Sequence, residues 1–225
     1  MRKMVKNGVI VASIVLGLGA TSASAEAFVS AGYGVNSSGD KNILSIQPAA
    51  ELVGDGGSQI EVRVGFSGND YMGNEQSRAY LYGWNNPDKN GEVGFGVGGE
   101  WISRPFDNKS IGLVVGGQVG YGWQGVSGKE QAISTSATKV SFIVGNSAST
   151  PSVATYENDT YVLDIGLTLG TTYAITKNWS IDLGYVYKYS NYQVSYRTNA
   201  NSQVLNELTF NQDNHMIRTG LNYRF

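Results

Sequence analysis

The last thirteen residues of the chain, 213–225, carry the pattern that most restricts its fold. Taken two residues at a time, one face holds His215, Ile217, Thr219, Leu221, Tyr223 and Phe225, and the other holds Met216, Arg218, Gly220, Asn222 and Arg224. A period of two with one mostly apolar face and one polar face is that of a β-strand. An edge strand of a soluble sheet can show the same pattern, so this segment alone predicts a strand and not an architecture.

Seven further segments repeat this alternation. The predicted strands cover residues 27–35, 60–67, 80–84, 93–101, 113–123, 161–173 and 179–189. Residues 37–59, 124–158 and 190–212 are long and polar and are predicted as loops, whereas residues 86–91, 103–110 and 176–178 are predicted as short turns. The pattern therefore predicts an all-β protein with eight strands. Counted back from the C-terminus, the three long loops all fall on the side away from it, and residues 103–110 and 176–178 fall on its own side.

Ten strands are the alternative. Residues 43–53 and 138–144 could each supply one more, although Pro48 interrupts the first and residues 132–137, just before the second, have no consistently apolar face. An even number is required if both ends of the chain lie on the same side of a membrane. We expect eight.

The N-terminus predicts export. Arg2, Lys3 and Lys6 precede an apolar run at residues 9–19, and the small residues Ala23-Ser24-Ala25 follow. This is the pattern of a secretory signal peptide, and the run is too short to span a bilayer as a helix. We expect residues 1–25 to be a cleaved signal peptide and residues 26–225 to form one domain.

Composition excludes several classes of protein. The 30 Gly, 14 Tyr and 4 Trp suit strands in which glycines alternate with aromatic residues, and the absence of Cys excludes disulfides and thiolate metal sites. Without the signal peptide, 13 Lys and Arg face 18 Asp and Glu, a net charge of −5. A nucleic-acid partner is not expected, because it requires a basic surface.

The C-terminal strand also resembles a known signal. Arg218, Gly220, Tyr223 and Phe225 match the C-terminal β-signal of outer-membrane β-barrels, and the segment TKNWSIDLGYVYKY with the ending GLNYRF resembles the small barrels of the OmpX and opacity-protein kind. The resemblance implies a closed antiparallel transmembrane barrel in the outer membrane, whose lipid surrounds it. It also implies assembly by the barrel machinery and periplasmic chaperones, variable surface loops, and no shared catalytic residues. Because the chain ends at the barrel, no peptidoglycan-binding domain is implied.

The polar face of the predicted strands contains charged residues of both signs. Four acidic and four basic side chains are expected to point inward: Glu61, Glu100, Asp164, Asp182, Arg63, Lys188, Arg218 and Arg224. The interior of an eight-stranded barrel is only wide enough for side chains. We therefore expect these groups to pair, since an isolated buried charge is very costly.

The outward aromatic residues fall near the two ends of the predicted strands. They are Tyr173, Trp179, Tyr223 and Phe225 near the short turns, and Tyr121, Trp123, Tyr161, Tyr187 and Tyr189 near the long loops. Two such bands are typical of the girdles that lie at the lipid headgroups.

No catalytic, metal or cofactor site is expected, and the chain is not predicted to be an enzyme. Asp213 and His215 have the spacing of an omptin-type pair, but His215 shares a face with Ile217 and Leu221, so it is expected to point outward. Two functions remain: a structural or interaction protein that binds a host or surface ligand through its long loops, and a porin-like channel for small solutes. An outer-membrane enzyme is a distant third.

Overall fold

The computed structural model describes residues 24–42, 56–69, 74–89, 91–106, 109–125, 130–132, 153–156, 160–197 and 206–225. Every regular element in these residues is a strand. The strands are β1 (Ser24–Asn42), β2 (Gly57–Asn69), β3 (Glu75–Asn86), β4 (Glu92–Ser103), β5 (Ile111–Gln124), β6 (Glu130–Ala132), β7 (Val153–Tyr156), β8 (Thr160–Ala174), β9 (Trp179–Arg197) and β10 (Asn206–Arg224). Among the described residues, no helix is long and apolar enough to cross a membrane.

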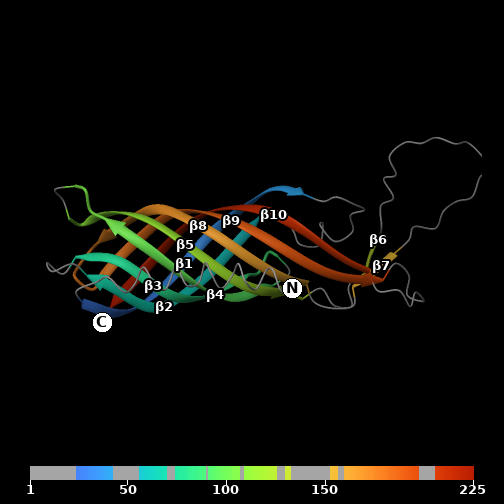
Figure 1. Ribbon diagram of the computed structural model, residues 1–225, viewed down its shortest axis with the longest axis horizontal. Helices are drawn as coiled ribbons and strands as arrows, with labels where there is room; N and C mark the ends of the chain where they lie inside the picture. The colour runs from blue at the N-terminus through green and yellow to red at the C-terminus, as the bar shows by residue number, and fades with distance from the viewer. Residues whose placement is uncertain are drawn as a thin grey trace, which may run out of the picture.

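Eight long strands close into a barrel. Strands β1 to β5, β8, β9 and β10 pair antiparallel in that order, and β10 pairs with both β9 and β1. The C-terminus lies at one end of the barrel, and the short hairpin β6–β7 extends from β9 at the other (Figure 1). The predicted closed antiparallel barrel of eight strands is confirmed, and the two candidates for extra strands, residues 43–53 and 138–144, lie outside the described residues.

The seam between β1 and β10 closes the barrel. It runs from the pair Phe28 and Arg224 towards the other end of the barrel, and the Phe225 amide donates a hydrogen bond to the Ala27 carbonyl at 3.0 Å. Gly32 faces Gly220 across the seam. The C-terminal strand is therefore hydrogen bonded on both edges, which leaves no free edge along this part of the sheet.

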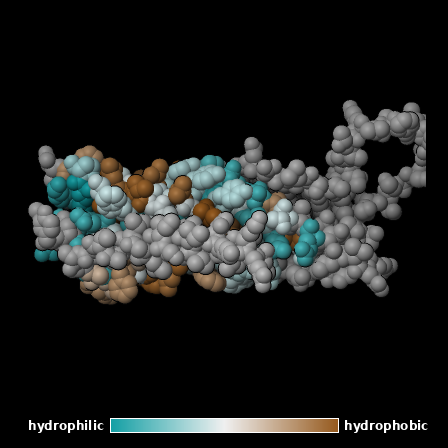
Figure 2. Space-filling view, viewed as in Figure 1, coloured by the Kyte–Doolittle hydropathy of each residue, from teal (hydrophilic) through white to brown (hydrophobic). Residues whose placement is uncertain are grey.

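The outer face of the barrel is apolar around its middle. Phe66, Leu167 and Ile217 expose between 63% and 65% of their surface, and many other outward side chains are comparably exposed. Figure 2 shows apolar residues in the middle of the visible surface and hydrophilic ones nearer the two ends of the described part. Such a continuous apolar belt is unusual for a protein in water and typical of a barrel in a bilayer.

Two strands continue beyond this belt, and the predicted loop boundaries were wrong there. Strand β9 runs to Arg197 and β10 begins at Asn206, although residues 190–212 were predicted as a loop. Beyond Tyr189 the side chains still alternate between the two faces, but the apolar ones now lie on the inner face. Tyr192 and Phe210 are buried inside and stack on each other, whereas Gln193 points outward. A strand outside the lipid has water around it, so its apolar side chains turn inward.

The other two predicted loops were also too long. Strand β1 continues to Asn42 and β2 begins at Gly57, within predicted loop 37–59. Predicted loop 124–158 contains the hairpin β6–β7. The predicted signal peptide lies outside the described residues, except that Ser24 and Ala25 pair with β2.

Candidate functional site

The interior of the barrel is filled with charged side chains. The structure places all eight of the predicted lumen residues inside, each exposing 8% or less of its surface: Glu61, Arg63, Glu100, Asp164, Asp182, Lys188, Arg218 and Arg224. Four more charged residues, on β3, β4 and the turn between them, are equally buried: Glu75, Arg78, Lys89 and Glu92. The described residues therefore bury six acidic and six basic side chains, and the interior carries no excess of either sign.

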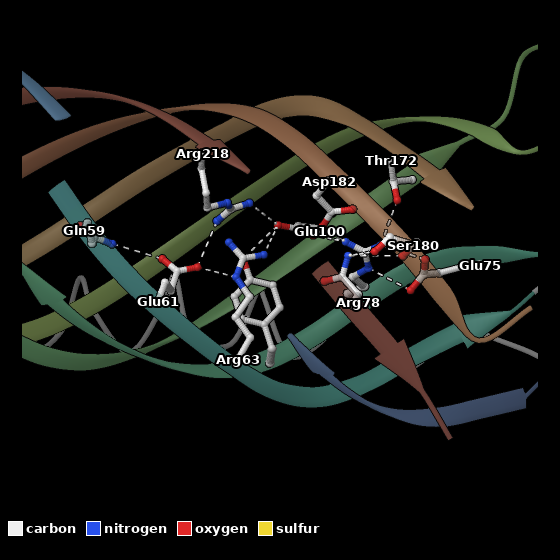
Figure 3. A network of polar contacts seen from close by, with 12 residues as sticks. Gln59, Glu61, Arg63, Glu75, Arg78, Glu100, Thr172, Ser180, Asp182 and Arg218 are labelled. Carbon is white, nitrogen blue, oxygen red and sulfur yellow. Dashed lines mark hydrogen bonds and ion pairs between the residues drawn. The ribbon is translucent and has the colours of Figure 1, made fainter. Parts of the chain in front are cut away.

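Glu100 is the centre of this network (Figure 3). Its carboxylate accepts hydrogen bonds from Arg63 Nη1 at 2.6 Å and from Arg78 Nη1 and Arg218 Nη2 at 3.2 Å each. Glu61 accepts from Arg63 Nε at 2.5 Å and from Arg218 Nη1 at 3.2 Å. These side chains come from strands β2, β3, β4 and β10, so the network crosses the bore.

A second group lies around Arg78, nearer the end that carries the C-terminus. Arg78 donates to both carboxylate oxygens of Glu75, at 2.8 and 2.9 Å, and to Asp182 Oδ2 at 2.5 Å. It also donates to the Thr172 hydroxyl at 3.3 Å. Sequence reasoning missed Arg78 and Glu75, although Arg78 lies two residues before Tyr80 and thus shares its face.

Aromatic rings fill the bore beside the charges. Tyr80, Tyr82 and Trp84 point inward from β3, with Phe28 of β1 against Tyr80. Glycines of β4 and β5 make room for these rings: a Cβ added at Gly96 would lie 2.6 Å from Tyr82 Cε1 and closer still to the Val119 carbonyl oxygen. The aromatic residues and the opposite glycines thus depend on each other, and together they leave little space for water.

A folded turn narrows the bore at the end away from the C-terminus. Lys89, in the turn between β3 and β4, is buried, and its ammonium donates to Asn214 Oδ1 at 2.9 Å. Asp88 next to it accepts two hydrogen bonds of 2.6 Å from Ser58, one from the amide and one from the hydroxyl. These bonds lower the pKa of the Asp88 carboxyl from its ordinary value. The turn is therefore tied to both β2 and β10.

Among the described residues, a small cavity lies below this turn. It has about 10 Å³, and Lys89, Glu92, Asp164, Lys188 and Tyr192 are among the residues that line it. Lys188 Nζ lies 3.9 Å from Asp164 Oδ2 and donates to Gln59 Oε1 at 2.7 Å. Such a volume has room for about one water molecule, so it is not a path for solutes.

The residues of the predicted assembly signal lie at the seam. Arg218 and Arg224 point into the lumen, and Gly220 has ordinary packing, because an added Cβ would lie 3.6 Å from the Ala31 carbonyl oxygen. Tyr223 contacts Trp179 and Phe225, with ring centroids 4.8 and 5.0 Å apart. These residues therefore belong to the strand that closes the barrel, and recognition by assembly machinery stays a prediction.

The predicted girdle residues lie on the outer face. Tyr173, Trp179 and Phe225 are exposed at the end that carries the C-terminus, and Tyr121, Trp123, Tyr161 and Tyr189 are exposed at the other. Tyr121 and Tyr161 stack with their centroids 6.0 Å apart, and Tyr187 donates to Asp213 at 2.8 Å. The aromatic residues are therefore near both edges of the apolar belt.

His215 lies on the outer face between two tyrosines. Its Nδ1 is 2.5 Å from the Tyr185 hydroxyl, and its ring also packs against Tyr187. Asp213 and His215 thus face away from the lumen. In the described part of the chain, they do not line a substrate cleft. Within the described residues, no group of three or more His, Cys, Asp or Glu side chains is arranged to hold a metal ion.

No protein-family model matches this chain, and no curated protein matches it in sequence. Among solved structures, it is similar to Neisserial surface protein A, with 12% identity and a TM-score of 0.44 over 90% of this chain and 99% of that one. Outer membrane protein H (OprH) from P. aeruginosa has 18% identity and a TM-score of 0.44, over 89% and 99% of the two chains. Outer membrane protein OprG from Pseudomonas aeruginosa has 12% identity and a TM-score of 0.40, over 91% and 98%.

Similarities this weak identify no function, and the strand pairing of the chain itself establishes its architecture. The sheet closes through β1 and β10, its outer face is apolar, and its interior is polar and densely paired. The chain is a closed eight-stranded antiparallel β-barrel with the architecture of a small outer-membrane protein.

Proposed function

We propose that this chain is an integral outer-membrane protein with a closed lumen, which acts at the cell surface through its extracellular segments. The observation that carries the proposal is the network around Glu100. It pairs side chains from four strands across the bore, beside the rings of Tyr80, Tyr82 and Trp84. A barrel whose interior is filled in this way is not suited to passing solutes. It is suited to holding in place the segments that connect its strands at either end.

The distribution of chain between the strands supports an orientation. Residues 43–56, 125–159 and 198–205 connect strands at one end, together with the short turn 87–91, whereas residues 70–74, 104–110 and 175–178 connect them at the other. The three longest connections therefore share one end. Outer-membrane barrels have short periplasmic turns and longer extracellular loops. The C-terminus would then lie in the periplasm, as expected if the N-terminal signal peptide directs export and periplasmic chaperones deliver the chain to the assembly machinery.

The part of β9 and β10 beyond the apolar belt supports a role in contact with other molecules. Its inner face is held together by Tyr192, Val194 and Phe210, all buried. Its outer face carries polar side chains such as Gln193 and Thr209. A rigid wall that rises from the membrane can hold the connecting segments away from the lipid, where a host cell or another surface can reach them.

A porin-like channel is the alternative. The described interior carries equal numbers of acidic and basic side chains, which does not favour a channel. A conducting path for ions would need continuous water and would be expected to carry an excess of one charge. The described residues leave a cavity of about 10 Å³ in the upper lumen, which is far too small for a solute.

Binding of whole cells to host cells and to abiotic surfaces tests the proposal. Cells that carry the gene are compared with cells that lack it, and with cells whose protein lacks residues 133–150. The control is Lys177→Gln, which changes one exposed side chain in the connection between β8 and β9 at the opposite end of the barrel. We expect binding to fall without the gene and with the shortened segment at equal surface levels. Equal binding by all four strains would contradict an interaction role.

A further inference from the structure

A patch of mostly polar side chains covers the outer face of the barrel where strands β8, β9 and β10 leave the apolar belt, at the end away from the C-terminus. We call it the outer grid. Its nine members are all at least partly exposed. They oppose one another in three rows of the strand register, from β8 to β9 to β10: Tyr161, Gln193 and Thr209; Leu163, Asn191 and Asn211; and Ile165, Tyr189 and Asp213.

The outer grid offers hydrogen-bonding atoms to a ligand. Asn191 Nδ2 donates to Asn211 Oδ1 at 2.6 Å, and the Tyr187 hydroxyl donates to Asp213 Oδ1 at 2.8 Å. Among the described residues, Asn191 Oδ1 and Asp213 Oδ2 have no donor and Asn211 Nδ2 has no acceptor. These three atoms are held in position by the hydrogen bonds of their own side chains. Two acceptors and a donor therefore face outward in a fixed arrangement.

Two tyrosine rings border these atoms. Tyr161 and Tyr189 expose 45% and 41% of their surface. Tyr161 also stacks on Tyr121 of β5, with the ring centroids 6.0 Å apart, so a neighbouring strand helps to fix its position. Aromatic faces carry a partial negative charge, and the rings bury a large area against a flat partner. The outer grid thus presents two exposed rings beside fixed donors and acceptors.

The chemistry of the outer grid matches a saccharide. Each sugar hydroxyl both donates and accepts hydrogen bonds, so it can pair with amide and carboxylate atoms alike. The C–H groups of a sugar ring carry a slight positive charge and pack against an aromatic face. Neighbouring strands are about 4.8 Å apart and same-face residues about 6.7 Å apart along a strand, so three strands and three rows cover about 10 by 13 Å. A short saccharide fits within that area.

The outer grid lies where the headgroup of a lipid reaches it. Just below it on β8 and β10, Leu167, Leu169 and Ile217 expose between 57% and 65% of their surface and belong to the apolar belt. A lipid whose acyl chains lie on these side chains places its headgroup on the outer grid. We propose that the outer grid binds the saccharide headgroup of a glycolipid in the surrounding leaflet. The proposal rests on the membrane placement in the proposed function, and it does not require cell binding.

Native mass spectrometry of the refolded barrel measures lipid binding. The detergent is an amine oxide, which has no sugar headgroup that would compete. The probes are diglucosyl diacylglycerol, phosphatidylcholine and phosphatidylglycerol with the same acyl chains, so that only the headgroup differs. The fraction of barrel that carries a lipid is followed as the concentration of each lipid rises.

Two variants test the outer grid. Asn191→Ala with Asn211→Ala removes the paired amides, and Tyr189→Leu removes one ring but keeps an apolar side chain at the edge of the belt. The matched control is Asn85→Ala. Asn85 is an exposed amide on the outer face of β3, four strands away around the barrel, and its neighbours on β2 and β4 are apolar. Gel migration of the unheated protein shows that each variant is folded.

The wild type should bind the glycolipid saturably and about tenfold more tightly than either phospholipid, and each test variant should weaken this binding about fivefold or more. Binding of both phospholipids should stay unchanged in the test variants, and Asn85→Ala should bind all three lipids as the wild type does. Equal binding of the three lipids by the wild type would show that the tyrosines form only a general girdle, and would overturn the proposal. Glycolipid binding that neither test variant weakens would also overturn it. Neither outcome involves adhesion of cells, so the proposed function is tested separately.

Discussion

The substitution Glu100→Gln tests the paired interior most sharply, because it removes one charge and almost no volume. Glu100 is 1% exposed and lies within 3.2 Å of Arg63, Arg78 and Arg218. Removing one partner of a buried ion pair costs about 3–5 kcal/mol, because the remaining charge stays buried without compensation. With a denaturant dependence of about 2 kcal/mol/M in urea, the unfolding midpoint should fall by roughly 2 M.

The assay is equilibrium unfolding of the refolded barrel in detergent, followed by tryptophan fluorescence. Glu207→Gln makes the same chemical change at an exposed position of β10 and should alter the free energy of unfolding by no more than about 0.5 kcal/mol. Combining Glu100→Gln with Arg63→Gln removes one charge of each sign, so its cost should be smaller than the sum of the two single costs. If Glu100→Gln is as mild as Glu207→Gln, water rather than arginine surrounds this carboxylate, and the account of the interior is wrong.

Three further predictions concern packing, assembly and pH. Gly96→Val should prevent refolding, because a Cβ there overlaps Tyr82 and the Val119 carbonyl, whereas Gly220→Ala should refold normally; gel migration of the unheated barrel distinguishes the two outcomes. Deletion of Phe225 should leave refolding in detergent intact, because burial of an aromatic side chain contributes roughly 1.5–3 kcal/mol and this one is 71% exposed, but surface-exposed protein in cells should fall sharply. Normal surface levels would show that the residue is not part of an assembly signal. Asp88 has a lowered pKa, so its bonds to Ser58 should persist above the ordinary Asp pKa of about 3.9 and be lost as the pH falls through the lower folded value. The rate of amide hydrogen exchange at Ser58, corrected for its intrinsic pH dependence, should then rise at low pH in the wild type. In Asp88→Ala the corrected rate should be high at all pH values.

Much of the fold could be predicted from the alternation of polar and apolar residues, because this alternation depends on local backbone geometry. Counting by two reaches the inner face of a strand without knowledge of its neighbours, and Glu61 and Asp182 lie there. The same count, extended two residues before Tyr80, would have found Arg78. Arg78 was missed because the aromatic residues of β3 were not assigned to the inner or the outer face from the sequence.

Other features depend on tertiary structure and could not be obtained in this way. Lys89 lies in a turn of the kind that is ordinarily solvated, and it is buried because the turn folds over the bore towards Asn214. The ends of β9 and β10 were missed for a different reason. The period of two continues past Tyr189 while the apolar face changes sides, and where that happens is set by the edge of the lipid.

The central claim is that side chains close the lumen, and single-channel recording in planar lipid bilayers tests it most directly. The refolded wild-type barrel should give no conductance steps, because the Glu100 network and the rings of Tyr80, Tyr82 and Trp84 fill the bore. Regular steps whose ion selectivity changes in Glu100→Gln would contradict the claim, since they would show that Glu100 lines a water-filled path.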